Sequence, residues 1–253
     1  FGIGEENMVA AAAGMASVGK KPFVFTAGAF LAYRSMEFIR DDVCFQNLNV
    51  KIVGMGSGLS WSSLGPTHHT TEDISVLRAI PNLMILSPAT PRQVVACVQT
   101  AYEHDGPVYI KIGMNHEKEY FEDNYVHDIK KSDCLREGKN IAVFVTGSIL
   151  EEAVKTCEML EQDGISAKLI NVTTIKPFNE KEVIDIVKEI DKVAVIEEHN
   201  IHGGLASIIS ETITYNGLEA RVIPIGLNDT FAEGYGTYAM VRKANQLDAI
   251  NIY

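Results

Sequence analysis

Short apolar runs, typical of buried strands, alternate along this chain with longer amphipathic segments that are typical of helices. In the first half the pattern predicts strands at residues 23–26, 49–53, 83–86 and 108–112, and helices at 5–18, 30–40, 71–79 and 91–104. Strands separated by helices pair in parallel, and the right-handed crossovers between them place helices on both faces of the sheet. The alternation therefore predicts an α/β fold.

A polar, charge-rich segment at residues 115–139 interrupts this alternation and is typical of a linker between domains. The pattern then resumes, with predicted strands at 141–145, 167–172, 192–197 and 220–225 and predicted helices at 149–163, 179–190 and 204–215. We therefore expect two three-layer α/β/α domains with mainly parallel sheets, over residues 1–129 and 130–253. Phe1 to Gly4 lead directly into a helix without a preceding strand, so we expect earlier residues or another chain to complete the first domain.

The charge and cysteine content narrow the class of partner. The formal net charge of -11 disfavours binding to nucleic acid phosphates or to an anionic membrane surface. No apolar run approaches the roughly 18 residues of a transmembrane helix. The cysteines form no Cys-x-x-Cys pair and are typical of reduced thiols rather than of disulfides or a zinc site; they are Cys44, Cys97, Cys134 and Cys157. The sequence thus predicts a cytoplasmic protein with neither nucleic acid nor membrane as partner.

Two glycine-containing motifs are compatible with a ligand but do not require one. Gly54-x-Gly56-x-Gly58 follows a predicted strand. The third glycine of a dinucleotide-binding fingerprint would fall on Leu59, however, so that function is disfavoured. Thr146-Gly147-Ser148 opens a predicted helix, where it can hold an anion or cap the helix, and capping alone explains it.

Glu5 and the adjacent His68 and His69 are the candidate functional groups of the first domain. Glu5 begins a helix, where the helix dipole favours a carboxylate even without a function. The histidines end the motif Gly65-Pro66-Thr67-His68-His69 in a loop beyond a strand, and open α/β sheets bind ligands at the carboxyl ends of their strands. A loop histidine is often merely solvated, so neither feature alone assigns a function.

Several segments in combination occur in order at the spacing of a known family: Gly2-Ile3-Gly4-Glu5-Glu6-Asn7-Met8, the strand and aromatic helix from Pro22 to Arg40, and Gly65-Pro66-Thr67-His68. On these segments the chain resembles the C-terminal half of transketolase, where they form the pyrimidine-binding domain, as in deoxyxylulose phosphate synthase. Ile175-Lys176-Pro177 and Glu197-Glu198-His199 with Gly203-Gly204 resemble the C-terminal domain, so the resemblance covers essentially the whole chain. It implies a thiamine diphosphate enzyme that transfers a two-carbon ketol unit between sugars.

The resemblance implies roles for residues that would hold the pyrimidine of the cofactor. Glu5, in an apolar pocket, would share a proton with ring nitrogen N1′ and so promote loss of the C2 proton of the cofactor. Phe30 matches the aromatic residue that stacks on the aminopyrimidine, and Tyr33, one turn on, matches a second wall of that pocket. An aromatic residue expected earlier is Ala27 here, so Phe25 or the partner chain fills that gap.

The resemblance also implies a substrate site. His68 matches the histidine that faces the substrate and assists proton transfer, whereas His69 either faces the same cavity or is structural. The family's acidic contact to a substrate hydroxyl aligns with Leu64. Its phosphate-contacting histidine aligns with Gly56, and its phosphate-contacting arginine aligns close to Met114. We therefore expect a substrate other than the standard phosphorylated ketoses, with replacement contacts from Trp61, Ser62 and Ser63.

The chain lacks the family's motif for the diphosphate and its metal ion, a Gly-Asp-Gly followed by an asparagine. The resemblance thus implies that the diphosphate and Mg²⁺ or Ca²⁺ are held by an N-terminal transketolase subunit, in an assembly with two copies of each chain, and that this chain supplies no metal ligand. The C-terminal domain is expected to make dimer contacts.

Two alternatives stay open for the function. One is a subunit of a 2-oxoacid-decarboxylating enzyme, similar to a dehydrogenase β subunit or to deoxyxylulose phosphate synthase. The other is a non-catalytic scaffold subunit that shares the fold. Gly-Pro-Thr-His favours transketolase over the first, and the presence of Glu5 and His68 disfavours the second.

Overall fold

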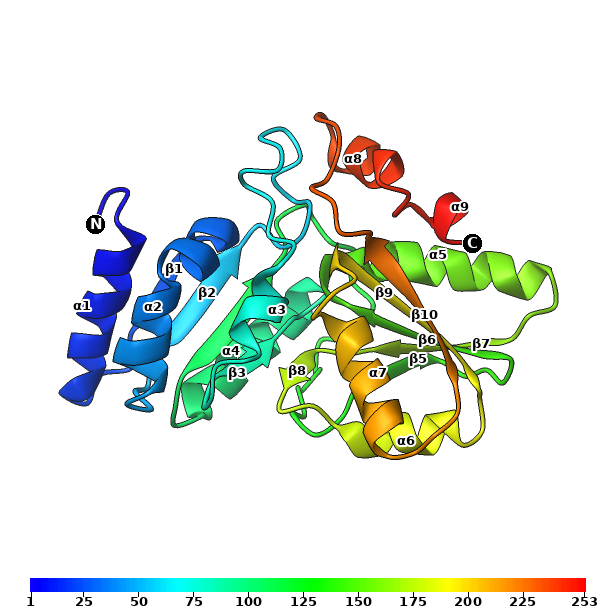
Figure 1. The fold of residues 1–253 in the computed structure, drawn as a ribbon, viewed down its shortest axis with the longest axis horizontal. Coiled ribbons are helices and arrows are strands. Elements are labelled where there is room, and N and C mark those ends of the chain that lie inside the picture. Colours follow the sequence, from blue (N-terminus) through cyan, green and yellow to red (C-terminus); the bar gives the residue numbers. More distant parts are fainter.

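Two five-stranded sheets lie side by side in the computed structural model, which describes residues 1–253 (Figure 1). The first sheet has the order β1-β2-β4-β3-β8 and the second the order β10-β9-β6-β7-β5. The strands of the first are β1 (Phe23–Ala27), β2 (Lys51–Met55), β3 (Met84–Leu86), β4 (Val108–Ile112) and β8 (Thr174–Lys176). Those of the second are β5 (Asp133–Arg136), β6 (Ile141–Thr146), β7 (Ala167–Asn171), β9 (Lys192–Asn200) and β10 (Arg221–Leu227). All pairings are parallel except those of the edge strands β8 and β5.

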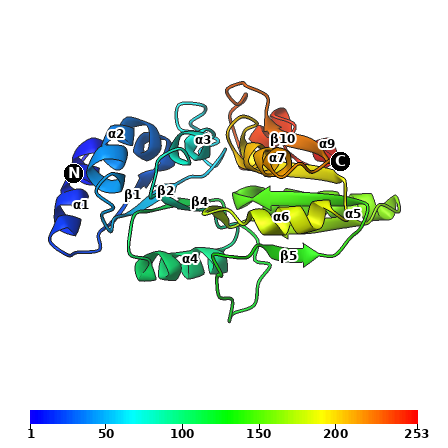
Figure 2. The same cartoon turned by 60° about the horizontal axis from the view of Figure 1, so that its bottom comes forward.

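Helices cover both faces of the first sheet, because its central strands carry apolar side chains on both sides. Side chains such as Ile52 and Tyr109 face a core that includes one group of helices. This group comprises α1 (Glu5–Ser17), the π-helical turns η1 (Phe30–Arg34) and η2 (Ile39–Cys44), α2 (Met36–Phe38) and α3 (Asp73–Leu77). Val108 and Ile110 face the other way, onto α4 (Pro91–Glu103), which lies on the opposite side of the sheet from α2 and α3 (Figure 2).

The second sheet has the same three-layer arrangement. Val143 and Val145 pack on α5 (Leu150–Gln162), which follows the short helix η3 (Gly147–Ile149), and on α8 (Tyr238–Ala244). Ala142 and Phe144, which point to the other face of β6, pack on α6 (Glu180–Val187) and α7 (Leu205–Tyr215). A last helix, α9 (Ala249–Ile252), packs on α5. None of the helices combines the length and the apolar character needed to cross a membrane.

This architecture confirms the predicted pair of three-layer α/β domains with mainly parallel sheets. The boundary between residues 129 and 130 stays a prediction and lies in the irregular segment that joins β4 to β5. Strand β5, which lies inside the predicted linker, was not predicted, and neither were β8, α8 and α9. The prediction of a single helix at 30–40 was wrong, because π-helical turns interrupt that segment.

Strand β8 connects the two halves of the chain. It belongs to the second half by sequence, yet it pairs antiparallel with β3 of the first sheet. The ammonium of Lys176 in this strand donates hydrogen bonds to the carbonyl oxygens of Arg78 and Ile80. The two domains are therefore linked by backbone pairing as well as by side-chain packing.

A buried ion pair joins the first sheet to helix α3. The ammonium of Lys111 lies 2.5 Å from a carboxylate oxygen of Asp73, and these side chains are 4% and 0% exposed. Lys111 also donates to the carbonyl oxygen of Thr70 at 2.8 Å, and the Tyr109 hydroxyl donates to Asp73 at 2.7 Å. Both charges are thus hydrogen-bonded, which buried charges require.

Replacing Asp73 with Asn should destabilise the protein by about 3 kcal/mol or more, because it leaves the Lys111 ammonium buried without its counter-charge. Urea unfolding, followed by circular dichroism, measures the change in the free energy of unfolding. Asp185→Asn is the matched control, because Asp185 pairs with Lys181 at the surface, where solvent screens the pair, and its loss should have little effect. Equal effects of the two substitutions would contradict the assigned role of the buried pair.

Candidate functional site

Glu5 is the first residue of α1, and its side chain is buried beside an arginine. The residue is 6% exposed, and its Oε2 accepts a hydrogen bond of 2.6 Å from the guanidinium of Arg34 on η1. The predicted apolar surroundings of Glu5 are therefore wrong in one respect, because the nearest polar partner is a cation. Arg34 was not among the predicted site residues, although an arginine that follows the largely apolar run Phe30 to Tyr33 was a visible signal.

Aromatic contacts continue from Arg34 to the predicted substrate histidine. The guanidinium carbon of Arg34 lies 5.0 Å from the ring centre of Phe30. The rings of Phe30 and His68 meet edge to face with centres 5.0 Å apart, and those of His68 and Trp61 lie 6.3 Å apart. These side chains, Glu5, Arg34, Phe30, His68 and Trp61, are called the Glu5–Trp61 row below. The structure thus brings together Glu5, Phe30 and His68, which were predicted to serve cofactor and substrate.

His68 and Trp61 belong to the histidine loop, defined as residues 56–70 after β2. A pair of backbone hydrogen bonds between Gly58 and Thr70 closes this loop at its base. Within it, the Nδ1 atom of His68 lies 2.9 Å from the hydroxyl oxygen of Thr67. The His68 ring is partly exposed, so it can exchange hydrogen bonds with a small molecule.

Trp61 occupies the space beside Gly56. A Cβ atom added to Gly56 would lie only 2.0 Å from Nε1 of Trp61, and the backbone of Gly56 has a positive φ of +77°. No side chain fits at residue 56 while Trp61 keeps this position. The indole of Trp61 can therefore occupy this space only because residue 56 is a glycine.

Tyr33 lies beside the Glu5–Trp61 row, whereas Phe25 lies away from it. Tyr33 lies next to Arg34, and its hydroxyl donates to a carboxylate oxygen of Glu72 at 2.8 Å and accepts from the Glu72 amide at 3.0 Å. Partial burial, with the Asp73 and Glu72 carboxylates nearby, raises the pKa of Tyr33 above its ordinary value. Phe25 is 63% exposed and lines a different, apolar groove between α1 and β1, together with Phe1, Met8, Ala12, Met15, Pro22, Phe23 and Val24. The structure does not bring Phe25 to the row.

The two serines of the histidine loop have different surroundings. Ser62 is buried, and its hydroxyl donates a 2.9 Å hydrogen bond to the carbonyl oxygen of Gly236 in the second half of the chain. The prediction that Ser62 offers a free donor to a substrate is therefore wrong, since that proton is already committed. Ser63 is exposed, as is Leu64 beside it.

His69 is 3% exposed, and neither of its ring nitrogens has a hydrogen-bond partner. Burial lowers the pKa of His69, so its imidazole is neutral at neutral pH. A neutral imidazole has one donor and one acceptor to offer. The geometry leaves open both roles that were predicted for His69.

Glu198, at the end of β9, fixes the histidine loop from the second domain. Its carboxylate is buried and accepts hydrogen bonds from the Leu59 amide at 3.2 Å, the Tyr238 hydroxyl at 2.7 Å and the Arg242 guanidinium at 2.5 Å. Gly58 makes room for it, because a Cβ there would lie 2.3 Å from Glu198 Oε2. The second domain therefore positions the loop that carries His68, a role that was not predicted for it.

The neighbours of Glu198 in the Glu197-Glu198-His199 motif have structural roles. Glu197 accepts hydrogen bonds from the first amides of α7, those of Leu205 and Ala206, and so caps that helix. The amide of Asn200, one residue after the motif, donates to the carbonyl oxygen of Thr71 at 2.7 Å. The end of β9 thus contacts the histidine loop at Leu59 and the residue that directly follows it, Thr71.

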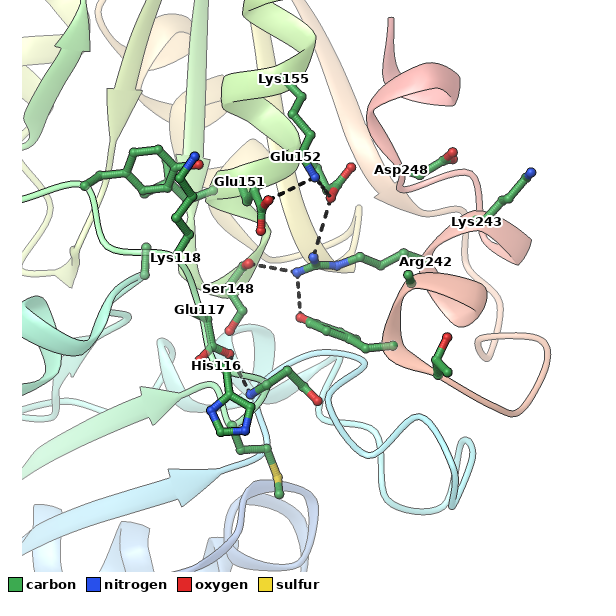
Figure 3. A pocket seen from close by; sticks show the side chains of 18 residues that line it. His116, Glu117, Lys118, Ser148, Glu151, Glu152, Lys155, Arg242, Lys243 and Asp248 are labelled. Carbon is green, nitrogen blue, oxygen red and sulfur yellow. Dashed lines mark hydrogen bonds and ion pairs between the residues drawn. The ribbon is translucent and has the colours of Figure 1, made fainter.

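A cavity of about 710 Å³ lies between α5, α8 and the segment after β4, and Figure 3 shows the charged side chains around it. Arg242 donates to the Ser148 carbonyl oxygen and to Tyr238, and Lys155 pairs with Glu151 and Glu152. The Thr146-Gly147-Ser148 turn therefore contributes to domain packing here. No residue of the Glu5–Trp61 row lines this cavity, and the chain has no cluster of three or more His, Cys, Asp or Glu side chains placed to hold a metal ion.

Replacing Glu198 with Ala should loosen the histidine loop, because the Leu59 amide loses its acceptor and Arg242 loses its buried counter-charge. We expect faster amide hydrogen exchange over residues 57–65 and a loss of stability of about 3 kcal/mol. Hydrogen exchange with mass spectrometry measures the loop directly. Glu211→Ala is the control, since Glu211 pairs with Arg78 near the surface. Unchanged exchange at Leu59 in the Glu198 variant would refute the proposed contact.

Two protein-family models match this chain. Residues 1–114 match the family model described as the transketolase pyrimidine binding domain, and residues 130–252 match the model of the transketolase C-terminal domain.

Two relatives and one solved structure extend this similarity over the whole chain. An apulose-4-phosphate transketolase subunit of Actinobacillus succinogenes is 34% identical over 99% of this chain and 81% of its own length. The 6-deoxy-6-sulfo-D-fructose transketolase subunit of a Clostridium species is 32% identical over 97% of this chain and 80% of its own length. A structure described as a split gene transketolase in an inactive beta4 tetramer superposes with a TM-score of 0.89 at 31% identity, covering 98% of this chain and 78% of that one.

Proposed function

This chain belongs to the transketolase family, and we propose that it is the C-terminal subunit of a two-chain transketolase, with Glu5 and His68 as its catalytic residues. As a member of that family it is part of a transferase that moves ketol units. The observation that carries the residue assignment is the Glu5–Trp61 row, in which a buried carboxylate, an aromatic ring and a partly exposed histidine follow one another. The cofactor is thiamine diphosphate, which the family uses.

The residues of the row fit the pyrimidine half of thiamine diphosphate. Only Oε2 of Glu5 has a partner, so Oε1 is free to share a proton with ring nitrogen N1′. Phe30 offers an aromatic face for stacking, and Tyr33, which follows on the same helical turn, would form a second wall. When bound, the cofactor would supply a nucleophilic carbon for reaction with the ketose carbonyl. His68 would hydrogen-bond the substrate oxygens and move a proton there.

A second chain completes the site in this proposal. Support comes from relatives that are themselves described as subunits. The partner, an N-terminal transketolase subunit, would hold the diphosphate and Mg²⁺ or Ca²⁺, in an assembly of two copies of each chain. The four free thiols support a reducing compartment, the cytoplasm.

The substrate is proposed to be a ketose other than the standard phosphoketoses. The space beside residue 56, where the family has a phosphate-contacting histidine, is filled by Trp61. Leu64 and Met114 stand where the family has an acidic residue and, nearby, an arginine, and both are exposed. Substrate contacts would come from Trp61, Ser63 and His69. The relatives described above act, by their descriptions, on apulose 4-phosphate and on 6-deoxy-6-sulfo-D-fructose.

Glu5→Gln should lower ketol transfer by the reconstituted complex by about 10²–10⁴-fold, because an amide cannot take the shared proton. The chain should remain folded. Steady-state kinetics with the partner chain measures the loss, and Glu6→Gln, one residue on, is the matched control. Full activity of the Glu5 variant would instead support the scaffold alternative.

Fructose 6-phosphate and xylulose 5-phosphate should be poor substrates, with kcat/KM on the order of 100-fold below that for the preferred ketose. The loss of two hydrogen bonds to a charged phosphate, at the lower end of about 1.5 kcal/mol each, costs about 3 kcal/mol and accounts for that factor. A panel that includes apulose 4-phosphate and 6-deoxy-6-sulfo-D-fructose measures the preference. Efficient turnover of the standard phosphoketoses would overturn the proposal, and release of carbon dioxide from 2-oxoacids would support the decarboxylating alternative.

A further inference from the structure

We propose that Arg34 is a positioning residue that decides where the proton shared between Glu5 and the cofactor ring resides. This inference rests on the proposed function, because it assumes that N1′ of the pyrimidine meets Glu5. In it, the positive charge of Arg34 beside Glu5 favours the shared proton on the ring nitrogen.

The contact between Arg34 and Glu5 has the features of a fixed counter-ion. The hydrogen bond is 2.6 Å long, and the side chains of Arg34 and Glu5 are 38% and 7% exposed. A carboxylate buried to this degree is costly unless a cation compensates it. The partly exposed guanidinium keeps part of its hydration, so it meets this need at a lower desolvation cost.

Arg34 fixes one oxygen of Glu5 and leaves the other available. The hydrogen bond goes to Oε2, and Oε1 has no partner in the structure. The same guanidinium lies over the ring of Phe30, with 5.0 Å between its central carbon and the ring centre. Arg34 thus contacts Glu5 and Phe30, two of the residues that are proposed to hold the pyrimidine, and it orients the carboxylate relative to the aromatic face.

The charge of Arg34 has a chemical consequence for the shared proton. A cation at hydrogen-bond distance favours the ionised form of a carboxyl group. When N1′ meets Oε1, one proton taken from the solvent is held between them, and no other bond is made or broken. Because Arg34 donates a 2.6 Å hydrogen bond to Glu5, its charge favours the arrangement with the carboxylate accepting and N1′–H donating. Removing that charge should weaken this preference for N1′–H.

The test uses the reconstituted two-chain complex with thiamine diphosphate carrying ¹⁵N at N1′. The ¹⁵N chemical shift reports whether this nitrogen is protonated. The wild-type complex should show the protonated shift, and Arg34→Gln, which keeps a donor but removes the charge, should move the resonance toward the unprotonated value. Arg34→Lys retains the charge and should keep the protonated shift. Arg40→Gln is the matched control, because Arg40 lies exposed on η2 and pairs with Asp41, and it should match the wild type.

The outcomes separate this inference from the proposed function. If the wild-type complex binds no thiamine diphosphate, the proposed function fails. If the cofactor binds but N1′ is unprotonated in the wild type, or if Arg34→Gln leaves its shift unchanged, the role of Arg34 is refuted. Should Arg34→Gln fail to fold or to bind the cofactor, the ¹⁵N shifts of the wild type and of Arg34→Lys still test the inference. An unprotonated N1′ in either protein would refute it.

Discussion

The contact of Glu198 with the histidine loop is the interaction on which the candidate site depends. A buried carboxylate at the end of β9 accepts hydrogen bonds from the Leu59 amide, from Tyr238 and from Arg242. These donors come from a loop of the first domain and from a helix of the second. Each is buried or partly buried, so each needs the acceptor. The position of His68 is therefore a property of both domains, although His68 and every residue it meets in the row belong to the first.

Periodicity predicted the elements that bury continuous apolar faces and missed those that do not. β1, β2, β4 and β6 are short apolar runs bounded by turn residues, and each was predicted to within two residues at its start. β8 has three residues, and β5 has no fully buried residue, so neither carries a clear pattern. The π-helical turns at 30–44 shift the helical phase, which the spacing of apolar residues does not reveal.

The candidate site was predictable where its residues form family segments and unpredictable where they meet through space. Glu5, Phe30 and His68 came from such segments, and they do converge. Arg34 hydrogen-bonds Glu5, which lies 29 positions away in the sequence, and Glu198 hydrogen-bonds the Leu59 amide, which lies 139 positions away. No local pattern encodes such pairings. Ser62 was predicted as a substrate contact because it has a hydroxyl group, but that hydroxyl donates its hydrogen bond to the carbonyl oxygen of Gly236.

The residues proposed to hold the cofactor and those proposed to contact the substrate depend on different domains for their position. Glu5, Arg34 and Phe30 are held by α1 and η1, which pack on the core of the first sheet. Trp61 and Ser62 belong to a loop whose anchors, Glu198 and Gly236, lie in the second domain. The indole and the glycine at 56 must change together, because a side chain at 56 and Trp61 cannot share one space. That pair lies outside α1 and η1, so the proposed substrate contacts of the loop can vary while the elements that carry Glu5 and Phe30 keep their sequence.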